Sequence, residues 1–306
     1  MIHTNDYDVY SLQKKEEGDR KEPMDEEEVT FVTCFVHIYE NEPYEHKTAE
    51  WRVHQFEYIA ELGVKIVVYG CEKTMPLLQK CVAKYPNVKI LKIRDSICTT
   101  NCTTRSTPTP HTHRTYKDTE IYKMCCLKTF QYPEKRNPKK DTLEYMALMH
   151  CKIEFVYDAI IQNVWNTRTF AWMDFSMAYI FANKESTLEK LRILSKLSFH
   201  EHFMAVPGCW SPLSPNQLTP VTEQIHWKFC GTFFIGSVSS LLKFHAIYRE
   251  KYNEFLQLTD KMVWEVNVWA WLETNTEWNP IWYCSDHNDR IIDIPMNLCC
   301  RNLFLD

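Results

Sequence analysis

Residues 30–39 read TFVTCFVHIY, an apolar run rich in β-branched and aromatic residues that predicts a buried strand. Two more runs of this kind follow, VKIVVYG at 64–70 and VKILKI at 88–93. Helical patterns separate the three runs, at 48–62 and at 74–84. Strands that alternate with helices over short connections are typical of a parallel sheet with helices on its faces. This stretch therefore predicts an α/β fold.

The rest of the chain continues the alternation of strands and helices. The same criteria predict strands at 169–174, 202–207, 228–236 and 280–284, and helices at 141–163, 187–197, 237–257 and 260–273. Sequences that resemble capping boxes, at 141–144 and 186–189, mark the starts of two of these helices. We therefore expect a mostly parallel central sheet flanked by helices, in a single domain over residues 29–306.

Two segments differ in composition from this domain. Residues 1–28 hold ten acidic and four basic residues, which predicts a mobile acidic tail. Residues 99–117 hold eight threonines and two prolines without periodicity, which predicts a loop excursion. The remainder of the chain is nearly balanced in charge, and such a surface is a poor match to nucleic-acid phosphates. We expect no nucleic-acid partner.

Three further features of the sequence exclude classes of protein. They are the spacing of the glycines, the number of cysteines and the length of the uncharged stretches. None of the six glycines is spaced as G-x-G or precedes a P-loop lysine, which excludes the usual nucleotide-binding glycine loops. The thirteen cysteines occur in a long chain in which we find no secretory leader pattern, so we expect reduced thiols and a cytoplasmic location. The longest uncharged stretch, 229–242, is too short to span a bilayer, and we expect no membrane span.

Two candidate metal ligands follow predicted strands, at the edge where open α/β sheets bind ligands. Asp174 ends the strand 169–174, and a carboxylate there can hold a divalent cation that bridges diphosphate oxygens. Alternatively, Asp174 only caps the turn that follows this strand. His287 lies between two acids in CSDHND at 284–289, where it supplies a second metal ligand or belongs to a solvated turn.

Two acids belong to the predicted helix 260–273, which is apolar nearly all round and therefore buried. Asp260 would lie at the N-terminus of this helix, as a cap or as a base that the helix dipole keeps ionised. Glu265 lies among tryptophans, where it is either a general base with a raised pKa or one partner of a salt bridge.

A further cluster offers zinc-type ligands within the threonine-rich loop. Its spacing matches no common zinc finger, and a zinc-stabilised interaction module built on this loop is a third reading of the chain. The four residues are Cys98, Cys102, His111 and His113.

Several segments, in their order along the chain, resemble the WlaTC/HtrL-like glycosyltransferases. The segments are TFVTCFVHIYE from 30, VKIVVYG from 64, FAWMDFSMAYIF from 170, FCGTFFIGS from 229 and LTDKMVWEV from 258. The resemblance covers roughly residues 29–285 and implies a GT-A type fold. It also implies a transfer of sugar from a nucleotide-diphosphate sugar to a hydroxyl acceptor, which belongs to a glycan, a protein or another molecule. A divalent cation, Mn²⁺ or Mg²⁺, is the implied cofactor.

The same resemblance implies roles for particular residues. Asp174 matches the family's metal-binding acid, His287 its late metal-binding histidine, and Asp260 the acid of its T/S-D-E segment. The implied nucleotide-sugar-binding residues are Thr33, His37, Arg52, Tyr69, Lys152, Asp174 and Gly231, the implied metal ligands are Asp174 and His287, and the catalytic candidates are Asp260 and Glu265.

The chain also departs from the family pattern. Ser176 replaces the second acid of D-x-D, Lys261 replaces the glutamate after Asp260, and Thr232 replaces a glycine. Because this motif keeps only one acid, an alternative stays open. The chain is then a GT-A-shaped binding or structural protein without catalysis.

Overall fold

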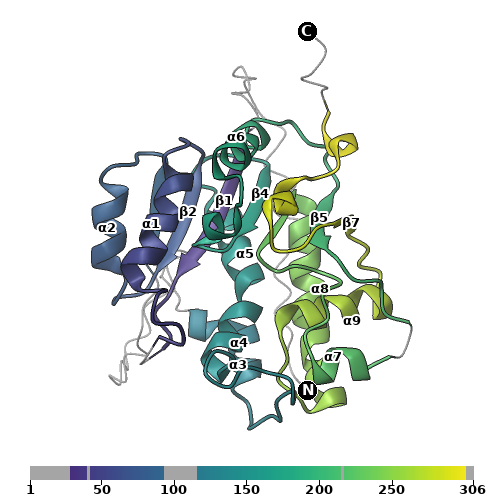
Figure 1. The fold of residues 1–306 in the computed structure, drawn as a ribbon. Helices are drawn as coiled ribbons and strands as arrows, with labels where there is room; N and C mark the ends of the chain where they lie inside the picture. Colours follow the sequence, from purple (N-terminus) through teal and green to yellow (C-terminus); the bar gives the residue numbers. More distant parts are fainter. Residues whose placement is uncertain (1–27, 40–41, 93–115, 215–216, 301–306) are drawn as a thin grey trace, which may run out of the picture.

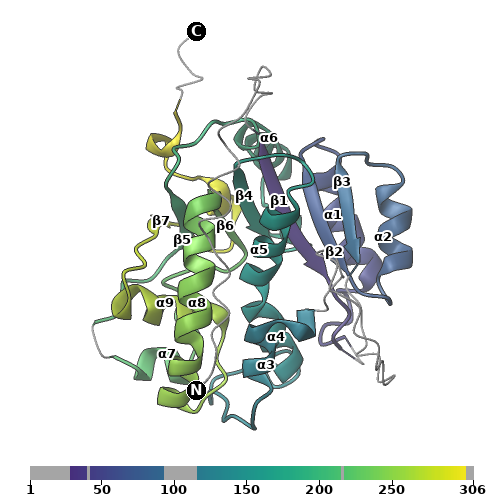
Figure 2. The same cartoon turned by 180° about the vertical axis from the view of Figure 1, so that it is seen from behind.

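The computed structural model describes residues 28–39, 42–92, 116–214 and 217–300 (Figure 1). The acidic tail up to residue 27 and most of the threonine-rich loop lie outside these residues, and so does the cluster of Cys98, Cys102, His111 and His113. Within them, a seven-stranded sheet runs through the molecule with helices on both faces (Figures 1 and 2).

The sheet has the strand order β3-β2-β1-β4-β6-β5-β7. The strands are β1 (Val29–Phe35), β2 (Ile66–Gly70), β3 (Val88–Lys92), β4 (Thr169–Met173), β5 (Met204–Gly208), β6 (Phe233–Ser237) and β7 (Ile281–Cys284). Strand β6 pairs antiparallel with β4 and β5, whereas the other neighbouring pairs are parallel. The predicted mostly parallel α/β sheet is confirmed.

The chain order creates a switch point between β1 and β4. From β1 the chain moves outward to β2 and β3, and it then returns to place β4 on the other side of β1. Connections on the two sides of such a point diverge and leave a crevice at the carboxyl ends of the strands, where open α/β sheets bind ligands. The topology therefore predicts a ligand site beyond Phe35 and Met173.

Helices cover each face of the sheet over a separate hydrophobic core. On one face lie α1 (Ala49–Ala60), α2 (Met75–Val82) and α6 (Lys184–Leu194), and on the other α4 (Leu143–His150), α5 (Lys152–Gln162), α8 (Val238–Thr259) and α9 (Glu265–Asn275). The short elements are α3 (Glu120–Cys125), α7 (Thr219–Glu223), η3 (Tyr116–Asp118), η4 (Met177–Ile180), η5 (Asp289–Ile292) and η6 (Met296–Leu298). Because strand side chains alternate, Phe31 packs into one core and Val32 into the other. The inner strands are thus buried on both sides, which explains their unbroken apolar runs, whereas the edge strands β3 and β7 are partly exposed.

Two predicted helix starts are wrong. The region 141–163 forms two helices, α4 and α5, that meet at Cys151. Thr142 caps α4 by accepting a hydrogen bond from the N–H of Tyr145, whereas the carboxylate of Asp141 accepts one from the N–H of Asn137 outside the helix.

The second error concerns α6, which starts at Lys184, ahead of the predicted capping box. The side chain of Asn183 accepts a hydrogen bond from the N–H of Ser186 and caps this helix. A capping side chain three residues earlier thus satisfies one of the free N–H groups of the first turn.

The predicted helix 260–273 is also wrong at its start, because α9 begins at Glu265. Asp260 is the C-cap of α8 instead, with a left-handed φ of 51°. A left-handed residue at this position ends a helix, so residues 261–264 form a connection between α8 and α9. Glu265, and not Asp260, lies in the first turn of α9.

Among the described residues, no helix has both the length and the hydrophobicity needed to cross a lipid bilayer. All cysteines in the described ranges are free thiols.

Candidate functional site

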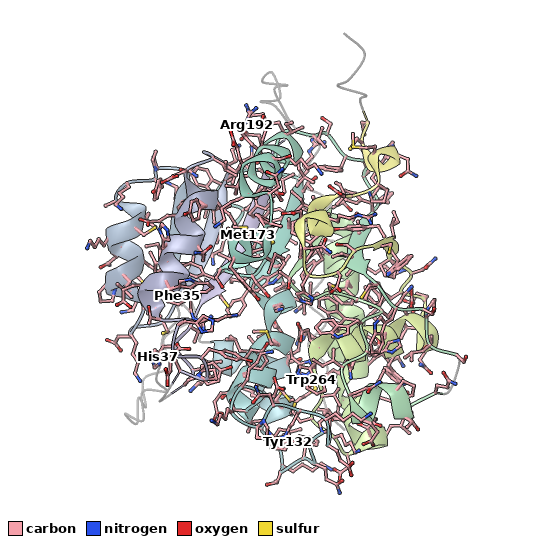
Figure 3. All side chains as sticks on the ribbon, in the orientation of Figure 1. Phe35, His37, Tyr132, Met173, Arg192 and Trp264 are labelled. Atoms are coloured by element: carbon pink, nitrogen blue, oxygen red, sulfur yellow. The ribbon has the colours of Figure 1, made fainter. Side chains whose placement is uncertain are left out.

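A cleft of about 270 Å³ opens at the carboxyl ends of β1 and β4, at the switch point. Residues 34–39 line it from β1 onward, and Asp174 lines it directly after β4. Gly231 enters from the same edge, because it lies near the start of the antiparallel β6. Figure 3 labels Phe35 and Met173 at the ends of the two strands, with His37 and Trp264 lower in the view.

Lys152, the first residue of α5, joins the groups at the floor of this cleft. Its Nζ donates to the carbonyl oxygen of Gly231 at 2.8 Å and to Oε1 of Glu265 at 2.8 Å, and it lies 3.1 Å from Oδ1 of Asp174. Burial by itself lowers the pKa of Lys152, but the two carboxylates outweigh burial and raise this pKa above its usual value. The ammonium therefore stays charged. The salt bridge considered for Glu265 from the sequence is present.

Gly231 permits this arrangement by close packing. A Cβ atom at this position would lie 2.3 Å from Oε1 of Glu265, which is closer than real contacts allow. The absence of a side chain thus lets Lys152 reach both Gly231 and Glu265. Close packing beneath the cleft therefore explains why residue 231 is a glycine.

Asp174 presents one carboxylate oxygen to the cleft. Its Oδ1 accepts a hydrogen bond from Nε1 of Trp172 at 3.0 Å in addition to the contact with Lys152. Within the described part of the chain Oδ2 has no hydrogen-bond partner, and 37% of the side chain is exposed. This oxygen is free to bind a cation or a ligand hydroxyl.

His287 lines the same cleft as Asp174. Its ring lies edge-on to Trp227, with centroids 4.7 Å apart, and its side chain is 32% exposed. An imidazole and a carboxylate are both suitable ligands for a divalent cation. The one group of three clustered metal-ligand side chains in the described ranges includes neither residue. A cation at Asp174 and His287 would thus take its other ligands from substrate and water.

Three basic residues form the rim of the cleft: Lys47, Arg52 and Lys140. Burial lowers the pKa of Lys47, and the positive charges of Arg52 and Lys140 lower it further. The ammonium of Lys47 also lies 4.3 Å from the ring centroid of Tyr179. These basic side chains thus face the cleft, where Arg52 is paired with Glu42 at 3.0 Å, and phosphate oxygens are the anions that such groups bind. Sequence reasoning found Arg52 but missed the two lysines, which lie far apart in the chain without a shared motif.

Three of the predicted site residues do not line the cleft. Thr33 is buried within β1, and the hydroxyl of Tyr69 donates to Oδ2 of Asp158 at 2.6 Å. Asp260 forms a half-exposed ion pair with Lys128 at 2.5 Å. His37, Arg52, Lys152, Asp174, Gly231, Glu265 and His287 do line it.

The strand order and the cleft over its reversal point define an α/β protein of the doubly wound class, with a cleft at the carboxyl edge of its sheet. The chain belongs to the HtrL_YibB family, whose model carries the description "Bacterial protein of unknown function" and matches residues 27–263. No curated protein matches the chain.

Two solved structures share its general shape at low similarity. One is 4-diphosphocytidyl-2C-methyl-D-erythritolsynthase from Anaerococcus prevotii DSM 20548, at 8% identity and a TM-score of 0.40, with 85% of this chain and 88% of that chain covered. The other is Rv0371c from Mycobacterium tuberculosis H37Rv, at 7% identity and a TM-score of 0.38, with coverage of 86% and 90%. Similarity at this level bears on neither the ligand nor the activity of this chain.

Proposed function

We propose that this protein is a glycosyltransferase that moves a sugar from a nucleoside-diphosphate sugar to a hydroxyl acceptor. The observation that carries the proposal is the pairing, in one cleft, of the free Oδ2 of Asp174 with the basic rim of Lys47, Arg52 and Lys140. The resemblance of five segments to the WlaTC/HtrL-like glycosyltransferases supports it from the sequence side.

The chemistry of glycosyl transfer gives the three basic rim residues the role of binding the leaving group. Glycosyl transfer breaks the bond between the anomeric carbon and a phosphate oxygen, so negative charge grows on the departing diphosphate. Fixed positive charges stabilise that growing charge more than they stabilise the bound donor. The three rim residues would bind the diphosphate. Asp174 and His287 would hold a divalent cation, which adds further charge neutralisation when it is bound.

A base is needed to take the proton of the acceptor hydroxyl, and we assign this role to Glu265. Asp174 is assigned to the cation, and of the two catalytic candidates from the sequence only Glu265 lines the cleft. Glu265 keeps its position because Lys152 binds its Oε1. Asp260, the other sequence candidate, lies outside the cleft lining and loses this assignment.

One observation favours a second candidate function, a nucleotide-sugar-binding protein without catalysis. The ammonium of Lys152 contacts both Asp174 and Glu265, and it neutralises part of the charge that would attract a cation. Ser176 also stands where the family has a second acid.

A thermal-shift screen of UDP-, GDP- and dTDP-sugars with Mn²⁺, followed by assay of nucleoside diphosphate release, separates the two functions. For a transferase we expect one donor class to raise the melting temperature by mass action and to be hydrolysed slowly. Asp174→Asn should abolish the hydrolysis in protein that still folds, while Asp293→Asn, outside the cleft, should leave the hydrolysis unchanged. Donor binding without release of nucleoside diphosphate supports the binding protein. If none of the donors binds, both assignments are wrong.

A further inference from the structure

Three metal-ligand side chains meet at the carboxyl ends of β5 and β7 and the start of β6. Cys209 follows β5, Cys230 comes before β6 and Asp286 follows β7. Their ligand atoms all lie within 4.8 Å of one another, and no other group of three in the described residues does so. The three strands are neighbours in the sheet, which explains why residues so distant in sequence meet.

Backbone hydrogen bonds hold the two cysteines in place. The N–H of Cys209 donates to the carbonyl of Trp227 at 2.9 Å, and the N–H of Cys230 donates to the carbonyl of Pro207 at 2.7 Å. These bonds link the segment after β5 to the segment before β6. The main chain therefore holds the two cysteines next to each other.

Gly208 makes this close approach possible. A Cβ atom at this position would lie 1.7 Å from the carbonyl oxygen of Lys228, so a larger residue would force the two segments apart. Its own carbonyl accepts a hydrogen bond from the N–H of Ser285 at 2.8 Å, which ties in the segment that carries Asp286. One glycine thus allows all three ligand-bearing segments to converge.

The donor set selects the kind of cation. Two thiolates with one carboxylate suit Zn²⁺, whereas Mg²⁺ and Ca²⁺ prefer ligand sets made of oxygen. Cys230 is buried, Cys209 is half-buried and Asp286 is exposed, so a cation can enter from solvent. We propose that Cys209, Cys230 and Asp286 bind one Zn²⁺, with water as the fourth ligand. Binding displaces the protons of the two thiols to solvent.

The zinc would have a structural role beside the cleft. Asp286 comes directly before His287, whose ring lines the cleft wall next to Trp227. A metal bond to Asp286 would hold this turn in one conformation and thereby place His287. The zinc site uses neither Asp174 nor the basic rim, so zinc binding can be measured without the proposed glycosyl transfer, which it would touch only through the position of His287.

Metal analysis of the full-length protein, purified with zinc and then dialysed against zinc-free buffer, tests the proposal. We expect about one equivalent of zinc per chain, and a loss of most of it in Cys209→Ser and in Cys230→Ser. Cys126→Ser, at an exposed thiol that ends α3, should retain the zinc, as should Asp174→Asn. The double variant Cys98→Ser/Cys102→Ser should retain it as well. If the zinc disappears from this double variant and stays in Cys209→Ser, the metal belongs to the threonine-rich loop and the proposal is wrong.

A second measurement avoids the replacement of the buried Cys230. Titration of the metal-free protein with Cd²⁺ should produce a sulfur-to-cadmium charge-transfer band that saturates at about one equivalent. The exposed variant Asp286→Asn should fold normally and release zinc to a chelator at a lower chelator concentration than the unmodified protein. If the protein purified with zinc under reducing conditions contains no zinc, and the metal-free protein gives no cadmium band, the proposal is wrong.

Discussion

The ammonium of Lys152 lies 2.8 Å from Oε1 of Glu265, a residue 113 positions further along the chain. The side chains are 3% and 7% exposed, so the pair is buried. Each residue is the first of its helix, α5 or α9, and the pair joins the start of one helix to the start of the other. The same ammonium also contacts Gly231 and Asp174. The ammonium of Lys152 therefore holds four segments of the chain together beneath the cleft.

Removal of the Lys152 ammonium should lower the free energy of unfolding. Lys152→Met leaves Glu265 buried without its partner, and breaking a buried pair in this way costs about 3–5 kcal/mol. Urea unfolding should show this loss as a lower midpoint. Lys196→Met, at an exposed position, should change the free energy of unfolding by less than about 0.5 kcal/mol. An unchanged midpoint for Lys152→Met would show that the ion pair does not stabilise the fold.

The close contact at Gly231 predicts a non-additive pair of mutations. Gly231→Ala places a Cβ atom 2.3 Å from Oε1 of Glu265, and such overpacking costs about 1–3 kcal/mol. In a Glu265→Ala background the clashing oxygen is absent, so the same substitution should cost much less. A double-mutant cycle on urea-unfolding free energies measures the difference. Gly63→Ala, where φ is 75° and no atom lies near the new Cβ, serves as the additive control. Equal costs of Gly231→Ala in both backgrounds would contradict the contact.

His150 predicts a loss of stability in acid. Burial lowers its pKa to about 4, and Lys152 acts in the same direction while Glu265 and the carbonyl of Val263 oppose it. The neutral ring donates from Nε2 to Val263 at 2.8 Å and accepts at Nδ1 from the hydroxyl of Tyr248. As the pH falls below 6.5, the unfolded chain takes up this proton first. The stability that the neutral His150 gives is therefore fully present above pH 6.5. As the pH falls towards 4, the free energy of unfolding decreases by about 3 kcal/mol.

Unfolding free energies measured between pH 7.5 and about pH 4.5 test this dependence. His150→Phe should give a shallower slope than the unmodified protein, because the titrating group is gone. His54→Gln, at an exposed position, should leave the slope unchanged. Identical slopes for all three proteins would show that His150 does not control the acid response.

Asp260 should tolerate substitution. Its pair with Lys128 is half exposed, and such pairs contribute less than about 1 kcal/mol. Asparagine adopts the left-handed conformation of this position readily. Asp260→Asn should therefore keep both stability and donor turnover, whereas Glu265→Gln should lower turnover. A folded Asp260→Asn protein without turnover would return the role of base to Asp260.

The sequence by itself determined the class of the fold and most of its strands, but not the starts of three helices. The runs that form β1, β2 and β4 are continuously apolar because each strand is buried on both faces, and this pattern is visible locally. It also determined where to look for ligands, since Asp174 follows directly after a buried strand. Glu265 and His287 were singled out from the residues around them, and Lys152 and Gly231 from the resemblance to the glycosyltransferases; all four line the cleft.

Only the tertiary structure decided which of these side chains meet. The antiparallel direction of β6 and the break between α8 and α9 leave no local pattern, because buried segments are apolar in either case. The contacts of Lys152 with Glu265 and of Cys209 with Cys230 join residues from different strands and helices. The basic rim brings together Lys47 and Lys140 across a long stretch of chain. Such contacts depend on the packing of whole elements, which spacing along the chain does not encode.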